Sequence, residues 1–159
     1  MDATEFAWKR RSGAPETYEG SVVPGIDLAA MLHDAANDLV AEVFGVTDLK
    51  SVAALPVRPV LRSINTVFDS PLRPGAPVLV GATLGSLSRR SFELRTGVWE
   101  AQDRRLISHG GVVFVVIDTQ LQEAVAVPQN VVDALRSLRP APDTAAPEPD
   151  NQHTWRGTP

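Results

Sequence analysis

The chain has 159 residues, 43% of them hydrophobic and 21% charged, which suits a single domain with a buried core. It has no cysteine, which excludes disulfides, zinc–thiolate sites and cysteine nucleophiles. Its net charge of −4 argues against general nucleic-acid binding, which needs a broad basic face, so any anion site must be local.

The N-terminal segment has no apolar stretch of the export-signal kind, and no apolar run approaches the roughly 18 residues that span a bilayer. We therefore expect a soluble, cytoplasmic protein without nucleic-acid or membrane partners. Residues 6–11, FAWKRR, are expected to form a first strand.

The longest helical pattern covers residues 25–45, directly after a proline. At about 100° per residue, it has an apolar stripe and an acidic arc. The stripe comprises Leu28, Leu32, Ala35, Ala36, Leu39 and Val43, and the arc comprises Asp27, Asp34, Asp38 and Glu42. Several alanines keep the helix slim, which suits close packing on a sheet. Gly45 is the expected C-terminal stop.

Four strands are predicted after the helix, at residues 57–68, 78–87, 91–100 and 106–117, because proline and glycine bound segments that alternate or run apolar. In the third strand, Phe92, Leu94, Thr96 and Val98 share one face. The fourth contains VVFVVI and is expected to be central and covered on both faces. Short joints predict a meander of hairpin neighbours, followed by a short helix at 128–138.

This order predicts an α+β fold with the long helix packed on one antiparallel sheet, in a single domain over residues 1–139. Residues 140–159 are rich in proline and acidic side chains and lack apolar periodicity, so they are predicted to be a disordered tail. His153 and Trp155 belong either to a docking motif or to an inert tail, and composition favours the inert tail.

The series of motifs resembles the hotdog-fold thioesterases, in particular the 4-hydroxybenzoyl-CoA thioesterase-like and related acyl-CoA thioesterases. The resemblance rests on the Ala-rich helix, FDSPLRPGAPV (68–78), SRRSFELR (88–95), GGVVFVVID (110–118) and a closing helix after Val127. It implies an antiparallel sheet wrapped around a long central helix, assembled as a homodimer or homotetramer with active sites at the dimer interface.

The resemblance also implies hydrolysis of an acyl-CoA or a carrier-bound acyl thioester. The partners are then a small acyl thioester and, as a further candidate, an acyl carrier protein. No separate cofactor is expected, because CoA or carrier pantetheine is part of the substrate.

Members of the family place an acidic nucleophile or base in the loop before the helix. Here Gly20 and Val22 fit the family pattern, but direct spacing puts Thr17 at the acidic position, and a one-residue gap puts Glu16 there. Glu16, and after it Glu19, are the candidate carboxylates, since partial desolvation raises the pKa of a carboxylate toward working pH. The alternative for each is an exposed loop carboxylate.

Backbone amides at the helix start polarise the thioester carbonyl in the family. Such amides carry partial positive charge and suit a developing oxyanion. Pro24 has no N–H, so the amides of Gly25 and Ile26 are the candidate donors.

His33 and Asn37 lie one helical turn apart at the edge of the apolar stripe. His33 is a candidate base, with Asn37 orienting it or binding substrate. The favoured alternative is a structural polar pair at a helix or dimer edge. Asp34 and Asp38 are secondary candidates, because some hotdog thioesterases carry their acid on this helix.

The segment Ser88-Arg89-Arg90-Ser91 corresponds to the residues that hold the CoA phosphates in the family, and arginine presents forked donors matched to phosphate. Adjacent residues of a strand face opposite ways, so both arginines reach one ligand only if the segment is still turning. The structural alternative is a charged strand start that protects an edge.

The three histidines share no ligand-like spacing, so no metal site is expected. Gly110 and Gly111, after His109, indicate a bulge or a close backbone approach. The chain has no G-x-S-x-G elbow, which disfavours a serine hydrolase. A non-catalytic acyl-thioester-binding protein remains open because the loop aspartate is missing, and a hotdog dehydratase or hydratase ranks last because its local Asp–His motif is absent.

Overall fold

The computed structural model describes residues 1–6, 8–14 and 22–138. The predictions for Glu16, Glu19 and the tail at 140–159 therefore lie outside the described residues. In chain order the elements are η1 (Ala3–Glu5), β1 (Trp8–Gly13), α1 (Gly25–Val43), α2 (Leu49–Ala53), β2 (Val57–Phe68), β3 (Pro77–Leu87), β4 (Ser91–Glu100), β5 (Leu106–Asp118), β6 (Glu123–Ala124) and α3 (Gln129–Ser137). The predicted long helix and four strands are confirmed, whereas α2 was not foreseen.

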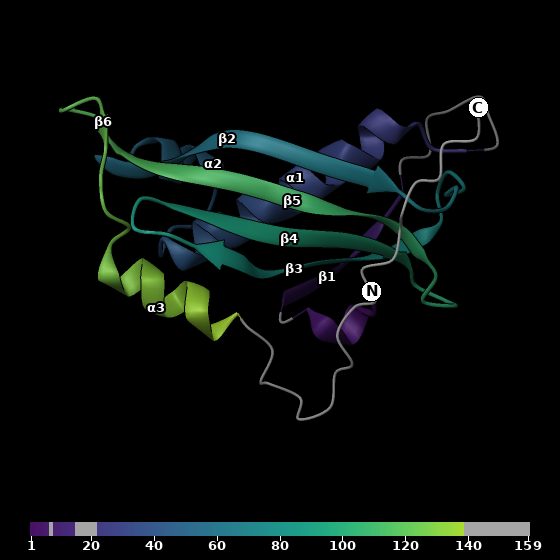
Figure 1. Cartoon of the computed structure of the whole chain (residues 1–159). Helices are drawn as coiled ribbons and strands as arrows, with labels where there is room; N and C mark the ends of the chain where they lie inside the picture. The colour runs from purple at the N-terminus through teal and green to yellow at the C-terminus, as the bar shows by residue number, and fades with distance from the viewer. Residues whose placement is uncertain (7, 15–21, 139–159) are drawn as a thin grey trace, which may run out of the picture.

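The strands form one antiparallel sheet in the order β1-β3-β4-β5-β2, with β6 paired to the end of β5, and α1 lies across one face (Figure 1). The predicted meander is wrong at one connection, because β2 pairs with β5 and not with β3. The eight residues 69–76 carry the chain from one side of the sheet to the other. That crossing covers three strand spacings, about 14 Å, well within the roughly 27 Å that eight extended residues reach.

The apolar stripe of α1 is buried as predicted, and it packs on β3, β4 and β5. All six stripe residues are buried, while Asp34, Asp38 and Glu42 of the acidic arc are exposed. The helix ends at Val43, and Gly45 follows with a φ of 72°, the left-handed stop that favours glycine. Within the described residues, no helix combines the length and hydrophobicity needed to cross a bilayer.

The central strands β4 and β5 bury the face that packs on α1, and they differ in how far the other face is buried. Phe92, Leu94, Thr96 and Val98 of β4 are buried as predicted. On the other face, Trp99 is also buried, because Phe6 packs edge-on against its indole with ring centroids 4.8 Å apart. The expectation for β5 holds only in part: it lies between β4 and β2, but Val113 and Val115 are only half-buried.

The β3 edge of the sheet is covered by the chain itself. Strand β1 pairs with β3 as far as Ala82, and α3 lies beside the rest of β3 (Figure 1). The Thr83 hydroxyl donates to the carbonyl of Leu138 at 2.6 Å, and Val131 and Leu135 of α3 join the main core. We call this side the closed edge, where β1 pairs with residues 77–82 of β3 and α3 flanks the rest of the strand.

The β2 edge is different, because β5 is the only strand among the described residues that pairs with β2, and β2 exposes large apolar side chains. These are Val60, Leu61, Ile64, Val67 and Phe68, with exposed fractions of 40% to 52%. We call this row the open edge. Such an edge is a template for pairing with another strand.

Gly110 marks a close backbone approach, one of the two predicted alternatives. A Cβ atom at this position would collide with the carbonyl oxygen of Asn65 on β2, so only glycine lets the two strands pair here.

Candidate functional site

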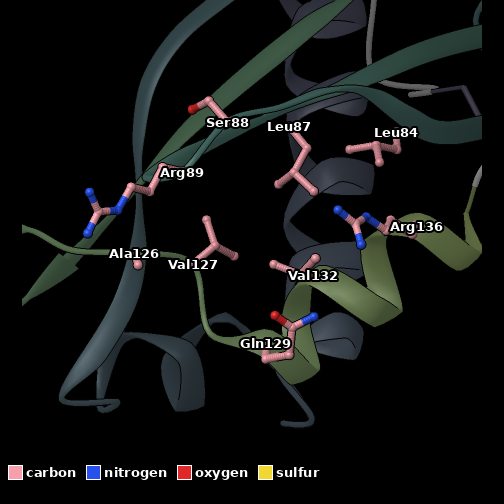
Figure 2. Close-up of a pocket in the computed structure, with 9 residues that line it drawn as sticks. All are labelled: Leu84, Leu87, Ser88, Arg89, Ala126, Val127, Gln129, Val132 and Arg136. Carbon is pink, nitrogen blue, oxygen red and sulfur yellow. The ribbon is translucent and has the colours of Figure 1, made fainter.

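A cavity of about 690 Å³ lies between the β3–β4 turn and α3 (Figure 2). Its apolar lining comprises Leu84, Leu87, Ala126, Val127 and Val132, and its polar lining comprises Ser88, Arg89, Gln129 and Arg136. We call it the arginine cavity. An apolar floor with a few polar groups at the rim is typical of small-molecule sites.

The turn between β3 and β4 forms one wall of the arginine cavity. Arg89 and Arg90 lie between β3 and β4, outside both strands, so the segment is still turning. The Ser88 amide donates to the Ser91 carbonyl at 2.8 Å, and the two serine hydroxyls lie 2.7 Å apart. Ser88 and Arg89 line the cavity, whereas Arg90 and Ser91 are not among its lining residues.

The opposite wall belongs to α3, which the sequence interpretation did not connect with the site. Figure 2 shows the Arg136 guanidinium reaching over the apolar floor, while Arg89 extends outward on the far side. In the described part of the chain, neither arginine has an acidic partner within 4.0 Å. Gln129, Val132 and Arg136 follow an i, i+3, i+7 spacing, and that pattern was the available indication that they share a helix face.

His33 and Asn37 are brought together at a second, smaller cavity of about 210 Å³, beside β2. The Asn37 Nδ2 atom lies 3.2 Å from the His33 Nε2 atom, and Asn37 is only 7% exposed. The rest of the lining is apolar, with Val40, Leu49, Val52, Pro59, Leu61 and Phe114. This histidine cavity holds one polar pair in an apolar enclosure, which can orient a polar group of a mostly apolar ligand.

The start of α1 lines a third cavity, of about 380 Å³. The ring of Phe68 lies over Gly25, so close that a Cβ atom there would lie 3.0 Å from the ring. The amides of Asp27 and Leu28 donate to the Pro24 carbonyl at 3.1 and 3.3 Å. Among the described residues, the amides of Gly25 and Ile26 donate to no backbone acceptor, as is usual in the first turn of a helix.

The predicted site residues that the structure describes do not converge within one chain. Gly25 and His33 are eight residues apart on one helix, about 12 Å along its axis at 1.5 Å per residue. A single carbonyl group therefore cannot contact both. Arg89 belongs to the arginine cavity, on the other side of the core from the histidine cavity.

A further polar pair was missed because of the wrong strand order. The His109 Nδ1 atom lies 2.6 Å from the Asp69 Oδ2 atom, across the β2–β5 pairing in which Val67 faces His109. Alternation along β5 places His109 on the face away from α1. The pair therefore fastens the end of β2 to β5, while Asp69 also lines the cavity at the start of α1.

Comparison with known proteins gives matches among solved structures only. No protein-family model matches the chain, and neither does any curated protein. One similar structure is Slr0204, a 1,4-dihydroxy-2-naphthoyl-CoA thioesterase from Synechocystis, with 18% identity, a TM-score of 0.71, and 82% of this chain and 96% of that chain covered. The SAV2348 protein from Staphylococcus aureus, in complex with CoA, has 14% identity, a TM-score of 0.75, and 95% and 94% coverage.

The BH1999 gentisyl-coenzyme A thioesterase is similar over 80% of this chain and 99% of its own, with 15% identity and a TM-score of 0.67. These identities are low, so the likeness concerns the fold. The fold predicted from the motifs is confirmed: the chain has the hotdog fold that these thioesterases share.

Proposed function

We propose that this protein hydrolyses an acyl-CoA thioester to a free acid and CoA. The observation that carries the proposal is the arginine cavity, a cationic site with an apolar floor on a hotdog fold, in a chain with a net charge of −4. Local positive charge in an acidic protein favours one anionic ligand over general polyanion binding.

In the proposed reaction, water attacks the thioester carbonyl and the carbon–sulfur bond breaks. Glu16, or Glu19 as second choice, takes a proton from the attacking water and gives it to the leaving thiolate, so the carboxylate is regenerated. The amides of Gly25 and Ile26 donate hydrogen bonds to the oxyanion, supported by their position at the start of a 19-residue helix and by the lack of another backbone acceptor among the described residues.

The open edge supports assembly into a homo-oligomer with sites at the interface. A second copy paired along β2 would bury the exposed apolar row and satisfy its unpaired backbone groups. Leu61 lines the histidine cavity and Phe68 lines the cavity at the start of α1, so both cavities border this edge. Residues of the second copy would then complete sites that one chain leaves divided.

A non-catalytic acyl-CoA-binding protein is the second candidate. It is favoured by Pro24, which has no N–H to offer, and by the roughly 12 Å that separates the start of α1 from His33. It predicts binding of acyl-CoA without turnover. A carrier-bound acyl group is the other substrate class, and it would make less use of the arginine cavity.

Thiol release from a panel of acyl-CoAs tests the proposal. We expect turnover by the wild-type protein, a loss of about 100-fold or more in kcat for Glu16→Gln, and unchanged affinity for the product CoA. CoA binding by calorimetry without turnover of any acyl-CoA would contradict hydrolysis and favour the binding protein.

A further inference from the structure

The histidine cavity is closed at its inner end and opens toward the open edge. Its inner lining is buried, since Val40, Val52 and Phe114 are each at most 3% exposed. Its outer lining is not, because Leu49 is 52% and Leu61 is 41% exposed. Leu61 belongs to the open edge, so the mouth of the cavity faces the side on which the proposed function places a second copy.

The volume of the cavity sets the size of the ligand that fits inside it. An apolar cavity of about 150 Å³ holds a benzene molecule. The histidine cavity, at about 210 Å³, therefore holds a single ring with one small substituent, or a chain on the order of six carbons. A long fatty chain does not fit. Helix α2 sets this limit on one wall, since Leu49 and Val52 both belong to it.

Asn37 is a polar group buried deep in this lining, with only 7% of its surface exposed. Among the described residues, its side-chain amide has one hydrogen-bond partner, His33, whose Nε2 atom lies 3.2 Å from Nδ2. An amide has two N–H donors and an accepting oxygen, so most of its hydrogen-bonding capacity is unused. Because an unpaired polar group in an apolar enclosure is unfavourable, a ligand that supplies a partner gains affinity.

The chemical group that suits Asn37 is a neutral hydroxyl. A hydroxyl both donates and accepts, so it can pair with either end of the amide. A carboxylate or an ammonium group does not suit the cavity, because a buried charge without a partner is costly. None of the described residues that line the cavity is a lysine, an arginine, an aspartate or a glutamate.

We infer that the histidine cavity holds the acyl group of the substrate and selects a compact acyl group with one hydroxyl, which bonds to Asn37. The inference rests on the proposed function and makes it more specific by naming the acyl class. Asn37 is then the specificity-determining residue for the hydroxyl, and Val52 is the one for the size of the acyl group.

Steady-state kinetics with matched CoA esters test the choice of a hydroxyl. The pairs are ω-hydroxyhexanoyl-CoA with hexanoyl-CoA, and each hydroxybenzoyl-CoA isomer with benzoyl-CoA. In at least one pair, kcat/KM of the hydroxylated ester should exceed that of its parent about tenfold or more. Asn37→Leu, which roughly conserves volume, should bring this ratio to about one. A wild-type ratio of about one in every pair, or a ratio that survives Asn37→Leu, would overturn the inference.

Urea unfolding of Asn37→Leu gives a second measurement. If the amide is mostly unpaired in the free protein, an apolar side chain of similar volume should leave the unfolding midpoint close to that of the wild type. A large fall in the midpoint would show that the amide is already satisfied within the chain, and it would count against a role in ligand selection.

Val52→Ala tests the limit on size. Removing the methyl groups of this side chain enlarges the cavity at its α2 wall, so the preferred acyl chain should lengthen by about one or two carbons. Val131→Ala is the matched control, because Val131 is equally buried but lies on α3, outside the cavity. A wild type that prefers palmitoyl-CoA to hexanoyl-CoA, or the same shift in both variants, would overturn the inference.

The result is separable from that of the proposed function, because calorimetry with the same esters detects selection without turnover. Tighter binding of a hydroxylated ester that depends on Asn37, in a protein that turns over no acyl-CoA, supports the inference and rejects hydrolysis. Turnover that is insensitive to both the hydroxyl and the chain length supports hydrolysis and rejects the inference.

Discussion

The two edges of the sheet have opposite structures. The closed edge is finished by β1 and α3 of the same chain, whereas the open edge leaves β2 unpaired with a row of apolar side chains. The arginine cavity lies at the closed edge, and the histidine cavity and the start of α1 lie at the open edge. Under the proposed function, CoA would therefore bind within one chain, whereas the proposed chemistry at the open edge would draw on a second copy.

The largest expected effect is a loss of stability at the closed edge. Leu135 of α3 is fully buried, so Leu135→Ala should lower the free energy of unfolding by about 3 kcal/mol through lost burial and a residual cavity. Urea unfolding measures it. Leu121→Ala, at a position 65% exposed, is the control and should stay within about 0.5 kcal/mol of the wild type. Equal losses would mean that α3 does not stabilise this edge.

The next effect should appear at the open edge as a change in assembly. Ile64→Lys places a charge in the apolar row and should raise the dissociation constant of the proposed homo-oligomer roughly 100-fold, about 2.7 kcal/mol, with little change in monomer stability. Sedimentation over a range of concentrations measures it. Leu121→Lys controls for added charge, and identical behaviour of the two variants would place the interface elsewhere.

A smaller difference is expected between glycine-to-alanine substitutions at the two edges, seen as a change in the free energy of unfolding. Gly110→Ala should cost about 2 kcal/mol, because its Cβ atom would push β2 away from β5. Gly13→Ala, at the closed edge, has no atom within 4 Å of the new methyl group and should be close to neutral. Thermal unfolding distinguishes them. Similar destabilisation by both would contradict the close approach of β2 and β5.

The smallest effect concerns α2, which borders the histidine cavity. Asp48 caps this helix by accepting from the Ser51 amide at 2.7 Å, and this hydrogen bond lowers the pKa of the carboxyl below its ordinary value. A lowered folded-state pKa gives stability that is present above the unfolded pKa and is lost as pH falls through the folded pKa. Asp48→Asn keeps a cap and should remove this part of the acid sensitivity, as pH-dependent unfolding can show.

The sequence predicted the elements better than their connections. Patterns fixed by local periodicity, such as the α1 stripe and the alternation from Phe92 to Val98, were confirmed because each depends on one element burying one face. The pairing of β2 with β5 was missed, because the proline-rich segment 69–76 looks like a turn although it crosses the sheet. The Asp69–His109 pair was not predicted for the same reason, because it forms across the β2–β5 pairing.

For the candidate site, too, the local segment was predicted and the packing of distant elements was not. The turn at Ser88 to Ser91 was predicted because charge and hydroxyls stand in one short segment. Arg136 was not, since its position opposite Arg89 depends on where α3 packs, 47 residues along the chain (136 minus 89). The roles of Glu16 and Glu19 remain predictions.

The most direct point to test is the proposed separation of the two sites, with nucleotide binding at the closed edge and thioester chemistry at the open edge. Steady-state kinetics of Arg89→Gln/Arg136→Gln with an acyl-CoA and with the matching acyl-pantetheine measure it. We predict a KM for the acyl-CoA raised about 100-fold, an unchanged kcat, and no change with acyl-pantetheine, because the proposal gives the two arginines contacts with the nucleotide alone. Equal losses with both substrates, or a fall in kcat at unchanged KM, would contradict the account.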